Sequence, residues 1–284
     1  MVIAGVVGYW GDKISMENSL SRVLDVESLC VTHFVRRTSA RRVPLHAVAG
    51  VDMHIQSGEI VGLVGESGSG KSSLSLAVAA LGKVTSGTIQ VSGHDLTRLR
   101  GKSLRRARAD VQMVFQDPHA SLDPRQTIGS GLNEIRKLHT DRVSKLTNEE
   151  LLLRVGLSPG ILDRVPSQIS GGQAQRVSIT RAMMLQPALL IADEPTSGLD
   201  ASVQAQIIDL FRSLRVDNGL SILFVSHNLA VVRQLCDRAY VMKEGVVVES
   251  GDTKTIFESP KHSYTKLLID AVPGKNLKLA ESGL

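Results

Sequence analysis

A glycine-rich octapeptide carries the strongest chemical signal in the sequence. It matches the Walker A pattern and consists of Gly65, Glu66, Ser67, Gly68, Ser69, Gly70, Lys71 and Ser72. Glycines let backbone N–H groups and the start of the following helix point toward phosphate oxygens. We expect Lys71 to bridge the β- and γ-phosphates and the Ser72 hydroxyl to bind Mg²⁺. Because the glycines are spaced three and then two residues apart, the reverse of a dinucleotide fingerprint, the pattern favours ATP or GTP as the ligand.

Two carboxylates close a second apolar run, as the Walker B pattern requires. Residues 189–192 are apolar and are followed by Asp193 and Glu194. A buried strand would deliver Asp193 to Mg²⁺, and Glu194 could hold and polarise an attacking water. Alone, an acidic pair at the end of a strand is equally typical of a solvated loop, so this interpretation depends on the Walker A sequence.

A second pair of glycines precedes another predicted helix. Ile169 is followed by Ser170, Gly171, Gly172 and Gln173, and the helical pattern then continues to residue 185. Ser170 is an N-cap candidate, and the glycines would expose backbone N–H groups, so the segment predicts a second anion site. A simple helix start is the alternative, but it leaves two phosphate sites beside one Walker B strand unexplained.

The pentapeptide at 169–173 closely resembles the LSGGQ signature of ATP-binding cassette (ABC) ATPases, with Ile in place of Leu. The resemblance covers about residues 24–272. Gln116 resembles the Q-loop glutamine that reaches the metal and the γ-phosphate, Asp200 ends a D-loop-like Ser-Gly-Leu-Asp, and His227 resembles the switch histidine that contacts the γ-phosphate. In this family the signature of one subunit closes over the Walker A loop of its partner. The resemblance therefore implies an ATPase that uses ATP and Mg²⁺ in sites shared between two subunits.

Two longer stretches, residues 115–125 and 259–268, are similar to the oligopeptide, dipeptide and nickel importer branch. Ser263 stands where that branch usually carries Pro. The chain lacks the C-terminal cysteines that bind an iron-sulfur cluster in some members, so it resembles the cluster-free subunit. The branch implies a second ABC ATPase subunit, two membrane permeases and a periplasmic or extracellular solute-binding protein. A heterodimer is favoured for the ATPases, with a homodimer as the alternative.

The resemblance implies an ATP-hydrolysing subunit on the cytoplasmic face of the inner cell membrane, coupled to import of di- or oligopeptides. Nickel, an opine or another small solute is the alternative cargo. A soluble ABC ATPase acting on ribosomes or DNA is less favoured, because such proteins usually join two cassettes or insert long coiled coils. Many exporters fuse membrane helices to the cassette, and no such segment occurs in this sequence.

The elements that must position these residues alternate between strands and helices. Apolar runs at 24–34, 47–55, 59–64, 111–115, 189–193, 220–225 and 239–242 predict strands, and helical patterns cover 72–81, 126–138 and 202–217, with another helix ending at Cys236. Thr147 and Glu150 form a capping-box pattern that predicts a further helix start ahead of Leu151. This alternation predicts an α/β fold. The resemblance refines it to a P-loop NTPase with an N-terminal antiparallel β subdomain, a RecA-like core and a helical subdomain inserted at about 118–175. We expect the ATPase domain over 23–272, a loose tail over 1–22 with Met16 as an alternative start, and a C-terminal tail over 273–284.

Composition excludes several classes. Of 284 residues, 42% are hydrophobic and 21% charged, which is ordinary for a globular protein and not for a disordered one. No apolar run reaches the ~18 residues that span a bilayer, and the apolar start, residues 2–11, has no basic residue ahead of it as a secretion signal would. The net charge is +5, but with 3% aromatic residues the two basic segments, at 36–42 and 98–108, predict a solvated face and no nucleic-acid partner. A face toward the membrane or bound phosphates is the alternative. Cys30 and Cys236 are expected to be buried free thiols.

One family feature is missing. Many ABC ATPases stack adenine on an aromatic residue ahead of the second strand, yet no aromatic residue lies between Arg36 and Val48. Phe34 is expected to lie too early, which leaves the guanidinium plane of Arg41 or Arg42 as a substitute.

Overall fold

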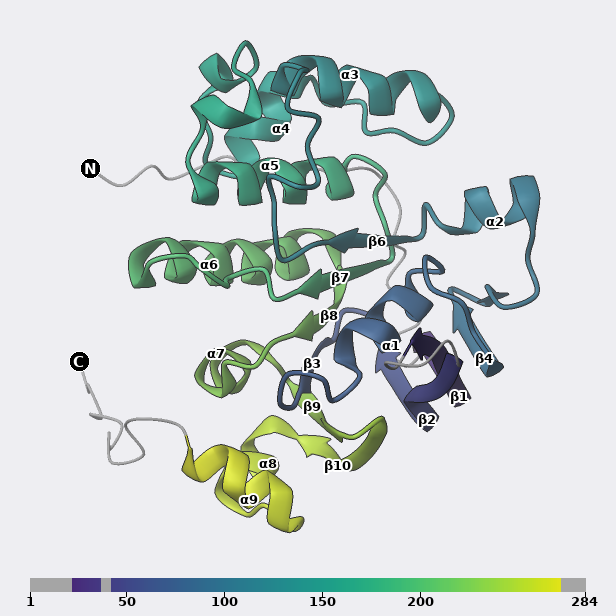
Figure 1. Cartoon of the computed structure of the whole chain (residues 1–284). Coiled ribbons are helices and arrows are strands. Elements are labelled where there is room, and N and C mark those ends of the chain that lie inside the picture. The colour runs from purple at the N-terminus through teal and green to yellow at the C-terminus, as the bar shows by residue number, and fades with distance from the viewer. Residues whose placement is uncertain (1–21, 37–41, 272–284) are drawn as a thin grey trace.

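The computed structural model describes residues 22–36 and 42–271, which form two β-sheets and a set of helices (Figure 1). The first sheet is antiparallel with the order β2-β1-β4-β5, and the second has the order β10-β9-β3-β8-β7-β6. Strands β3, β6, β7, β8 and β9 are parallel, and β10 joins antiparallel to β9. The strands are β1 (Arg22–Arg36), β2 (Arg42–Gln56), β3 (Ile60–Val64), β4 (Ser86–Val91), β5 (His94–Asp95), β6 (Val111–Val114), β7 (Leu189–Asp193), β8 (Ser221–Val225), β9 (Arg238–Lys243) and β10 (Val246–Asp252).

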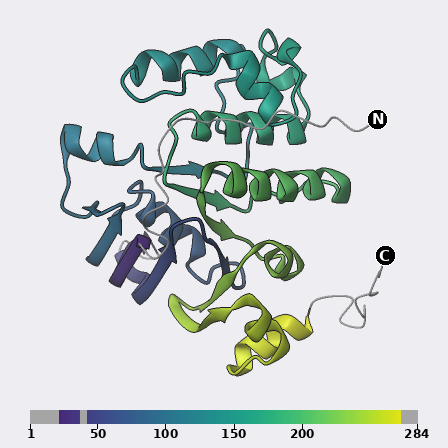
Figure 2. The ribbon, with the colours of Figure 1, turned by 180° about the vertical axis from the view of Figure 1, so that it is seen from behind.

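Helices cover both faces of the six-stranded sheet. They are α1 (Lys71–Val78), α2 (Gly101–Ala107), α3 (Ile128–Leu138), α4 (Asn148–Arg154), the 3₁₀ helices η1 (Pro159–Ile161) and η2 (Pro166–Gln168), α5 (Gly171–Met183), α6 (Ala201–Asn218), α7 (Leu229–Leu235), α8 (Thr253–Glu258) and α9 (Ser263–Asp270). In Figures 1 and 2, α3, α4 and α5 form a helical layer at the β6 end of the sheet, and α1 lies on the opposite side of the sheet from α6 and α7, beside β1 and β2.

Two hydrophobic cores meet at the six-stranded sheet. Along β7, Leu190 and Ala192 join the core formed with α3 to α7, while Leu189 and Ile191 join the core formed with α1 and the antiparallel sheet. All five residues of β7 are buried, as are all five of β3 and β8. These strands therefore read as continuous apolar runs, because parallel strands covered on both faces have no solvent side. The carboxylates of Asp193 and Glu194 come directly after such a run.

The α/β fold and the antiparallel N-terminal sheet are confirmed, while some element boundaries differ. The helix predicted over 72–81 begins at Lys71 and ends at Val78. Beyond it, Ala80 adopts a left-handed φ of 54°, and the N–H groups of Leu81 and Gly82 both donate to the carbonyl of Leu76, which stops the helix. Strands β4, β5 and β10 and helices α2, α8 and α9 were not predicted, because they are partly exposed and carry no long apolar run.

Other expectations have mixed outcomes. Cys236 is buried as predicted, but Cys30 is only half-buried, because its neighbours Leu29 and Val31 enter the core and successive side chains of a strand point to opposite faces. The predicted tails fall almost wholly outside the described residues, so the domain bounds at 1–22, 23–272, 118–175 and 273–284 stay predictions. Within residues 22–36 and 42–271, no helix combines the length and apolar composition needed to cross a bilayer.

Candidate nucleotide-binding site

The Walker A loop connects β3 to α1 and lies tightly against two other strands. A Cβ on Gly65 would lie 2.1 Å from the carbonyl oxygen of Met242, and one on Gly70 would lie 2.1 Å from that of Ala47. Both glycines also have positive φ, 152° and 105°. Because no larger side chain fits at either position, only glycine lets the loop pass this close to β9 and β2 before α1 begins.

Lys71 is the first residue of α1, and its ammonium group lies inside the loop. Its Nζ donates to the carbonyl oxygens of Gly65 at 2.8 Å and Glu66 at 2.7 Å. The residue is 6% exposed. Burial lowers the pKa of Lys71, and the carboxylates of Glu194 and Asp193 act in the opposite direction. The cation is therefore already placed in the phosphate cradle by backbone carbonyls.

Asp193 and Ser72 come together where β7 ends beside the first turn of α1. Burial raises the pKa of Asp193, and a side-chain hydrogen bond from Ser72 lowers it. Asp193 is buried, and its Oδ1 has no hydrogen-bond partner among the described residues. A carboxylate and a hydroxyl oxygen with one buried lone-pair site unfilled are the donors that Mg²⁺ prefers. The described residues hold no cluster of three or more His, Cys, Asp or Glu that could bind a metal, so phosphate and water oxygens would complete the shell.

Glu194 follows in a strained conformation that aims it at His227. Its φ is 48°, in the left-handed region that residues other than glycine rarely adopt. The N–H of Glu194 donates to the carbonyl of Val225 at 2.9 Å, which ties the strained residue to the end of β8. Oε1 of Glu194 lies 3.1 Å from Nδ1 of His227, whose side chain is 62% exposed. Two predicted site residues thus meet at the ends of the neighbouring strands β7 and β8, and strain of this kind is typical of functional sites.

Gln116 and Asp200 reach the same region with other partners. The Nε2 of Gln116 donates to Oγ of Ser197 at 3.4 Å, so the loop after β6 contacts the loop after Glu194. Asp200 is the N-cap of α6 and accepts from the N–H groups of Ser202 and Val203, both at 3.0 Å. These bonds, with that from Val203 the largest contribution, lower the pKa of Asp200. Its carboxylate therefore has a clear structural task in the single chain.

The predicted signature segment begins α5 with a local cap. Ser170 Oγ accepts from the N–H of Gln173 at 3.3 Å, and Gln173 Oε1 accepts from the N–H of Ser170 at 3.0 Å. This reciprocal capping box confirms the predicted N-cap. A Cβ on Gly172 would lie 2.6 Å from Cγ1 of Val203, so α6 approaches closely here. The sheet separates α5 from α1 (Figures 1 and 2), and the signature and Walker A segments face different surroundings.

The predicted substitute for an adenine-stacking aromatic has no described side chain. Arg41 lies outside the described residues, and nothing is described of the Arg42 side chain. Phe34 lies on β1 opposite Pro44, and 67% of it is exposed. The identity of the base contact remains a prediction.

Two residues near the loop were missed by sequence reasoning. His33 Nε2 lies 3.1 Å from Oγ of Ser73 in the first turn of α1. The hydroxyl of Tyr264, on α9, accepts from the N–H of Glu66 at 3.0 Å. Neither has a fixed spacing to the Walker A sequence, so no local signal could have found them.

Comparison with known proteins agrees with this geometry. Residues 48–197 match the family model described as "ABC transporter", and residues 248–281 match "Oligopeptide/dipeptide transporter, C-terminal region". The oligopeptide transport ATP-binding protein OppF of Salmonella typhimurium is 43% identical over 81% of this chain and 70% of its own length. AppF of Bacillus subtilis, also named an oligopeptide transport ATP-binding protein, is 45% identical over 80% of this chain and 70% of its own.

Solved structures give the same result for the fold. The dimeric ATP-binding cassette MJ0796, in a post-hydrolysis state bound to ADP and Pi, is 27% identical with a TM-score of 0.70, covering 81% of this chain and 98% of that one. The cbiO1 protein of Clostridium perfringens, part of the ABC transporter complex cbiONQ, is 29% identical with a TM-score of 0.67, covering 84% and 91%. The predicted P-loop NTPase fold is confirmed. The chain belongs to the ATP-binding subunits of ABC transporters, in the branch of the oligopeptide transport ATP-binding proteins.

Proposed function

We propose that this chain is the ATP-hydrolysing subunit of an importer of di- or oligopeptides. The observation that supports it most directly is that Lys71, Asp193, Glu194 and His227 come together at the carboxyl ends of β3, β7 and β8. The names of the relatives, oligopeptide and di/tripeptide transport ATP-binding proteins, favour peptides over nickel or an opine as the cargo.

Each group of site residues has a separate role in ATP hydrolysis. The Walker A loop and Lys71 bind the β- and γ-phosphates, and Glu194 orients a water for attack on the γ-phosphorus and accepts its proton. His227, next to Glu194, contacts the γ-phosphate and senses its presence. Ser72 and Asp193, with Gln116 approaching from the loop after β6, would hold Mg²⁺, which when bound supplies charge neutralisation to the phosphates. Gly65 to Ser69 supply the backbone around the anion.

The second subunit completes each site in this proposal. Helix α5, which begins at the signature, lies on the other side of the six-stranded sheet from α1 (Figures 1 and 2), so its N-terminus is available to the ATP of another ABC ATPase subunit. Asp200, at the start of α6, lies in the loop beside that surface. We infer a heterodimer, with a homodimer as the alternative.

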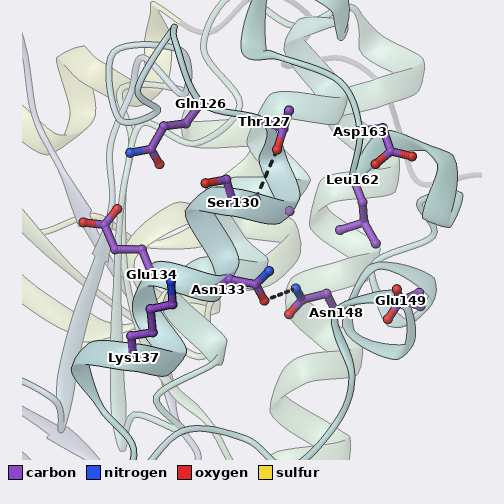
Figure 3. Close-up of a pocket in the computed structure, with 11 residues that line it drawn as sticks. Gln126, Thr127, Ser130, Asn133, Glu134, Lys137, Asn148, Glu149, Leu162 and Asp163 are labelled. Carbon is purple, nitrogen blue, oxygen red and sulfur yellow. Dashed lines mark hydrogen bonds between the residues drawn. The ribbon is translucent and has the colours of Figure 1, made fainter.

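The helical layer is the proposed permease contact. A hollow of about 640 Å³ opens along α3, between this helix and the segments around Asn148 and Leu162 (Figure 3). Its lining is polar and includes the charged side chains of Glu134, Lys137 and Glu149, and Asn148 Nδ2 donates to Asn133 Oδ1 at 2.9 Å across it. The hollow is connected through residues 116–126 to the Q-loop. A conformational change on nucleotide binding or hydrolysis can therefore be transmitted to the two permeases through one continuous segment of the chain.

The same proposal places the chain on the cytoplasmic face of the inner cell membrane, held there by the permeases. A periplasmic or extracellular solute-binding protein would deliver the peptide. Because the ATPase surface contacts permeases and not the solute, the cargo is assigned from the relatives.

Reconstitution tests this function. The chain, its partner ATPase and two permeases in proteoliposomes should import peptide with ATP hydrolysis that a peptide-loaded binding protein stimulates. Glu194→Gln should lower kcat at least ~10²-fold while ATP affinity stays within about twofold, because the amide cannot accept the proton from water. Glu258→Gln, an exposed change on α8, is the matched control. Nickel uptake without peptide uptake would contradict the cargo, and near-normal turnover by Glu194→Gln would contradict its role.

A further inference from the structure

Helix α9 contacts the phosphate-binding loop through one side chain. Tyr264 is 5% exposed and belongs to the core that α3 to α7 form on the sheet. Its hydroxyl accepts from the backbone N–H of Glu66, the second residue of the Walker A loop, at 3.0 Å. Tyr264 lies within residues 248–281, the part of the chain similar to the oligopeptide/dipeptide transporter C-terminal region. A segment typical of the transporter branch is thus bonded to the nucleotide loop.

The same peptide region also holds the catalytic cation. The carbonyl of Glu66 accepts from Nζ of Lys71 at 2.7 Å. Nζ of Lys71 also donates to the carbonyl of Gly65 at 2.8 Å, so the peptide group between Gly65 and Glu66 is held at its N–H by Tyr264 and at its carbonyl by Lys71. Hydrogen bonds in series polarise one another in a poorly solvated site, so the two contacts support each other.

Tyr264 is itself held in place by its neighbours. The carboxylate of Glu249, on β10, accepts from the N–H groups of Lys261 at 2.8 Å and His262 at 3.0 Å. Nδ1 of His262 caps α9 by accepting from the N–H of Tyr264 at 3.1 Å. Nζ of Lys243 lies 5.1 Å from the centroid of the Tyr264 ring. The hydroxyl is thus delivered by a fixed scaffold and not by a mobile side chain.

The phenol is suited to this task. Burial raises the pKa of Tyr264, and the hydrogen bond from Glu66 opposes that shift. The hydroxyl therefore stays neutral at physiological pH, where its oxygen accepts from the loop without bringing a negative charge beside the bound phosphates.

We propose that Tyr264 is a positioning residue for nucleotide binding, through which the C-terminal segment keeps the Walker A loop and Lys71 in the phosphate-binding conformation. The proposal rests on the proposed function, since it concerns the same ATP site. Without the hydroxyl, the N–H of Glu66 loses its acceptor, and the loop spends less time in the binding-competent form. Apparent affinity falls in proportion to that fraction.

Tyr264→Phe tests the proposal, because it removes only the hydroxyl and keeps the ring packed. The matched control is Tyr240→Phe. Tyr240 is 4% exposed, and its hydroxyl also accepts a backbone N–H, that of His54, at 3.1 Å, but it lies in the contact between β9 and β2. Equilibrium titration of the full chain with ATP should show about 3- to 10-fold weaker binding for Tyr264→Phe, the range expected for one lost hydrogen bond, and less than twofold change for Tyr240→Phe.

Two further readouts separate positioning from general destabilisation. The amide of Glu66 should exchange its hydrogen faster in Tyr264→Phe than in wild type, with no such change in Tyr240→Phe. In the assembled transporter, Tyr264→Phe should raise the KM for ATP by a similar factor and leave kcat nearly unchanged.

Unchanged ATP affinity in Tyr264→Phe, or an equal loss in Tyr240→Phe, would overturn the proposal. Both outcomes are distinguishable from failure of the proposed function. If the proposed function is wrong, the wild-type protein itself would fail to hydrolyse ATP with its permeases. The positioning role is tested separately, by the difference between the two phenylalanine variants.

Discussion

The Walker A loop and the signature segment are both glycine-containing starts of helices, yet they are built in opposite ways. The Walker A loop is held by distant parts of the chain. β2 and β9 crowd its glycines, the N–H of Gly245 donates to the carbonyl of Ser69 at 2.9 Å, and Tyr264 accepts from Glu66 at 3.0 Å. The signature is held mainly by itself, through the reciprocal hydrogen bonds of Ser170 and Gln173.

The difference also extends to burial. Lys71 at the start of α1 is 6% exposed, whereas Ser170 at the start of α5 is exposed. A loop that must surround a triphosphate needs many supports, because its curved backbone would otherwise sample other conformations. A helix end that only has to present N–H groups needs no more than a cap. The first is a nearly complete site within one chain, and the second fits half of a site shared with another chain.

The largest effect is expected from a substitution in the Walker A segment. Lys71→Ala removes the buried cation and should weaken ATP binding by the isolated chain about 100-fold or more, because charge-assisted bonds to phosphate have no replacement there. Isothermal titration measures this. Lys83→Ala, which removes an exposed lysine just beyond α1, should bind normally. ATP affinity within threefold of wild type would show that Lys71 does not contact the nucleotide.

A substitution in the signature segment should lower activity only in the assembled transporter. Ser170→Arg places a long cation where the partner's ATP is expected, so turnover of the transporter should fall at least about tenfold, while ATP affinity of the isolated chain stays within about twofold. Ser158 is also an exposed N-cap, and Ser158→Arg controls for the lost cap, worth ~1 kcal/mol. A large loss of affinity in the isolated Ser170→Arg chain would place the signature in its own chain's nucleotide site.

The smallest expected effect is a difference in stability between substitutions of the two signature glycines. A Cβ on Gly172 would lie 2.6 Å from Val203, whereas the nearest atom to a Cβ on Gly171 is Leu199 Cδ2 at 3.7 Å. Gly172→Ala should therefore be about 1 kcal/mol less stable than Gly171→Ala, since the gain in helix propensity is common to both and only one is overpacked. Urea denaturation measures the difference. Adding Val203→Ala should remove it, and equal stability of the two variants would mean that the close approach to α6 costs nothing.

Much of the fold and of the site was predictable because its causes are local. The capping boxes at Thr147 with Glu150 and at Ser170 with Gln173 join residues three positions apart, so their sequence pattern specifies their geometry. The buried runs of β3, β7 and β8 are visible as apolar stretches, and the Walker A glycines follow the first of them. Elements such as β4 and α9 are partly exposed and mix apolar with polar residues, so they carry no clear apolar run and were not predicted.

By itself, then, the sequence determined the order of the strands and helices that carry the site, the residue types at each loop and the Walker A, Walker B and signature patterns. These depend on interactions between near neighbours and on the alternation of apolar and polar residues. Only the tertiary structure decided that Glu194 lies 3.1 Å from His227, that one oxygen of Asp193 is buried without a partner among the described residues, and that Tyr264 bonds to Glu66. Such contacts join residues far apart along the chain, and their distances follow from how two cores pack on one sheet, which no local spacing encodes.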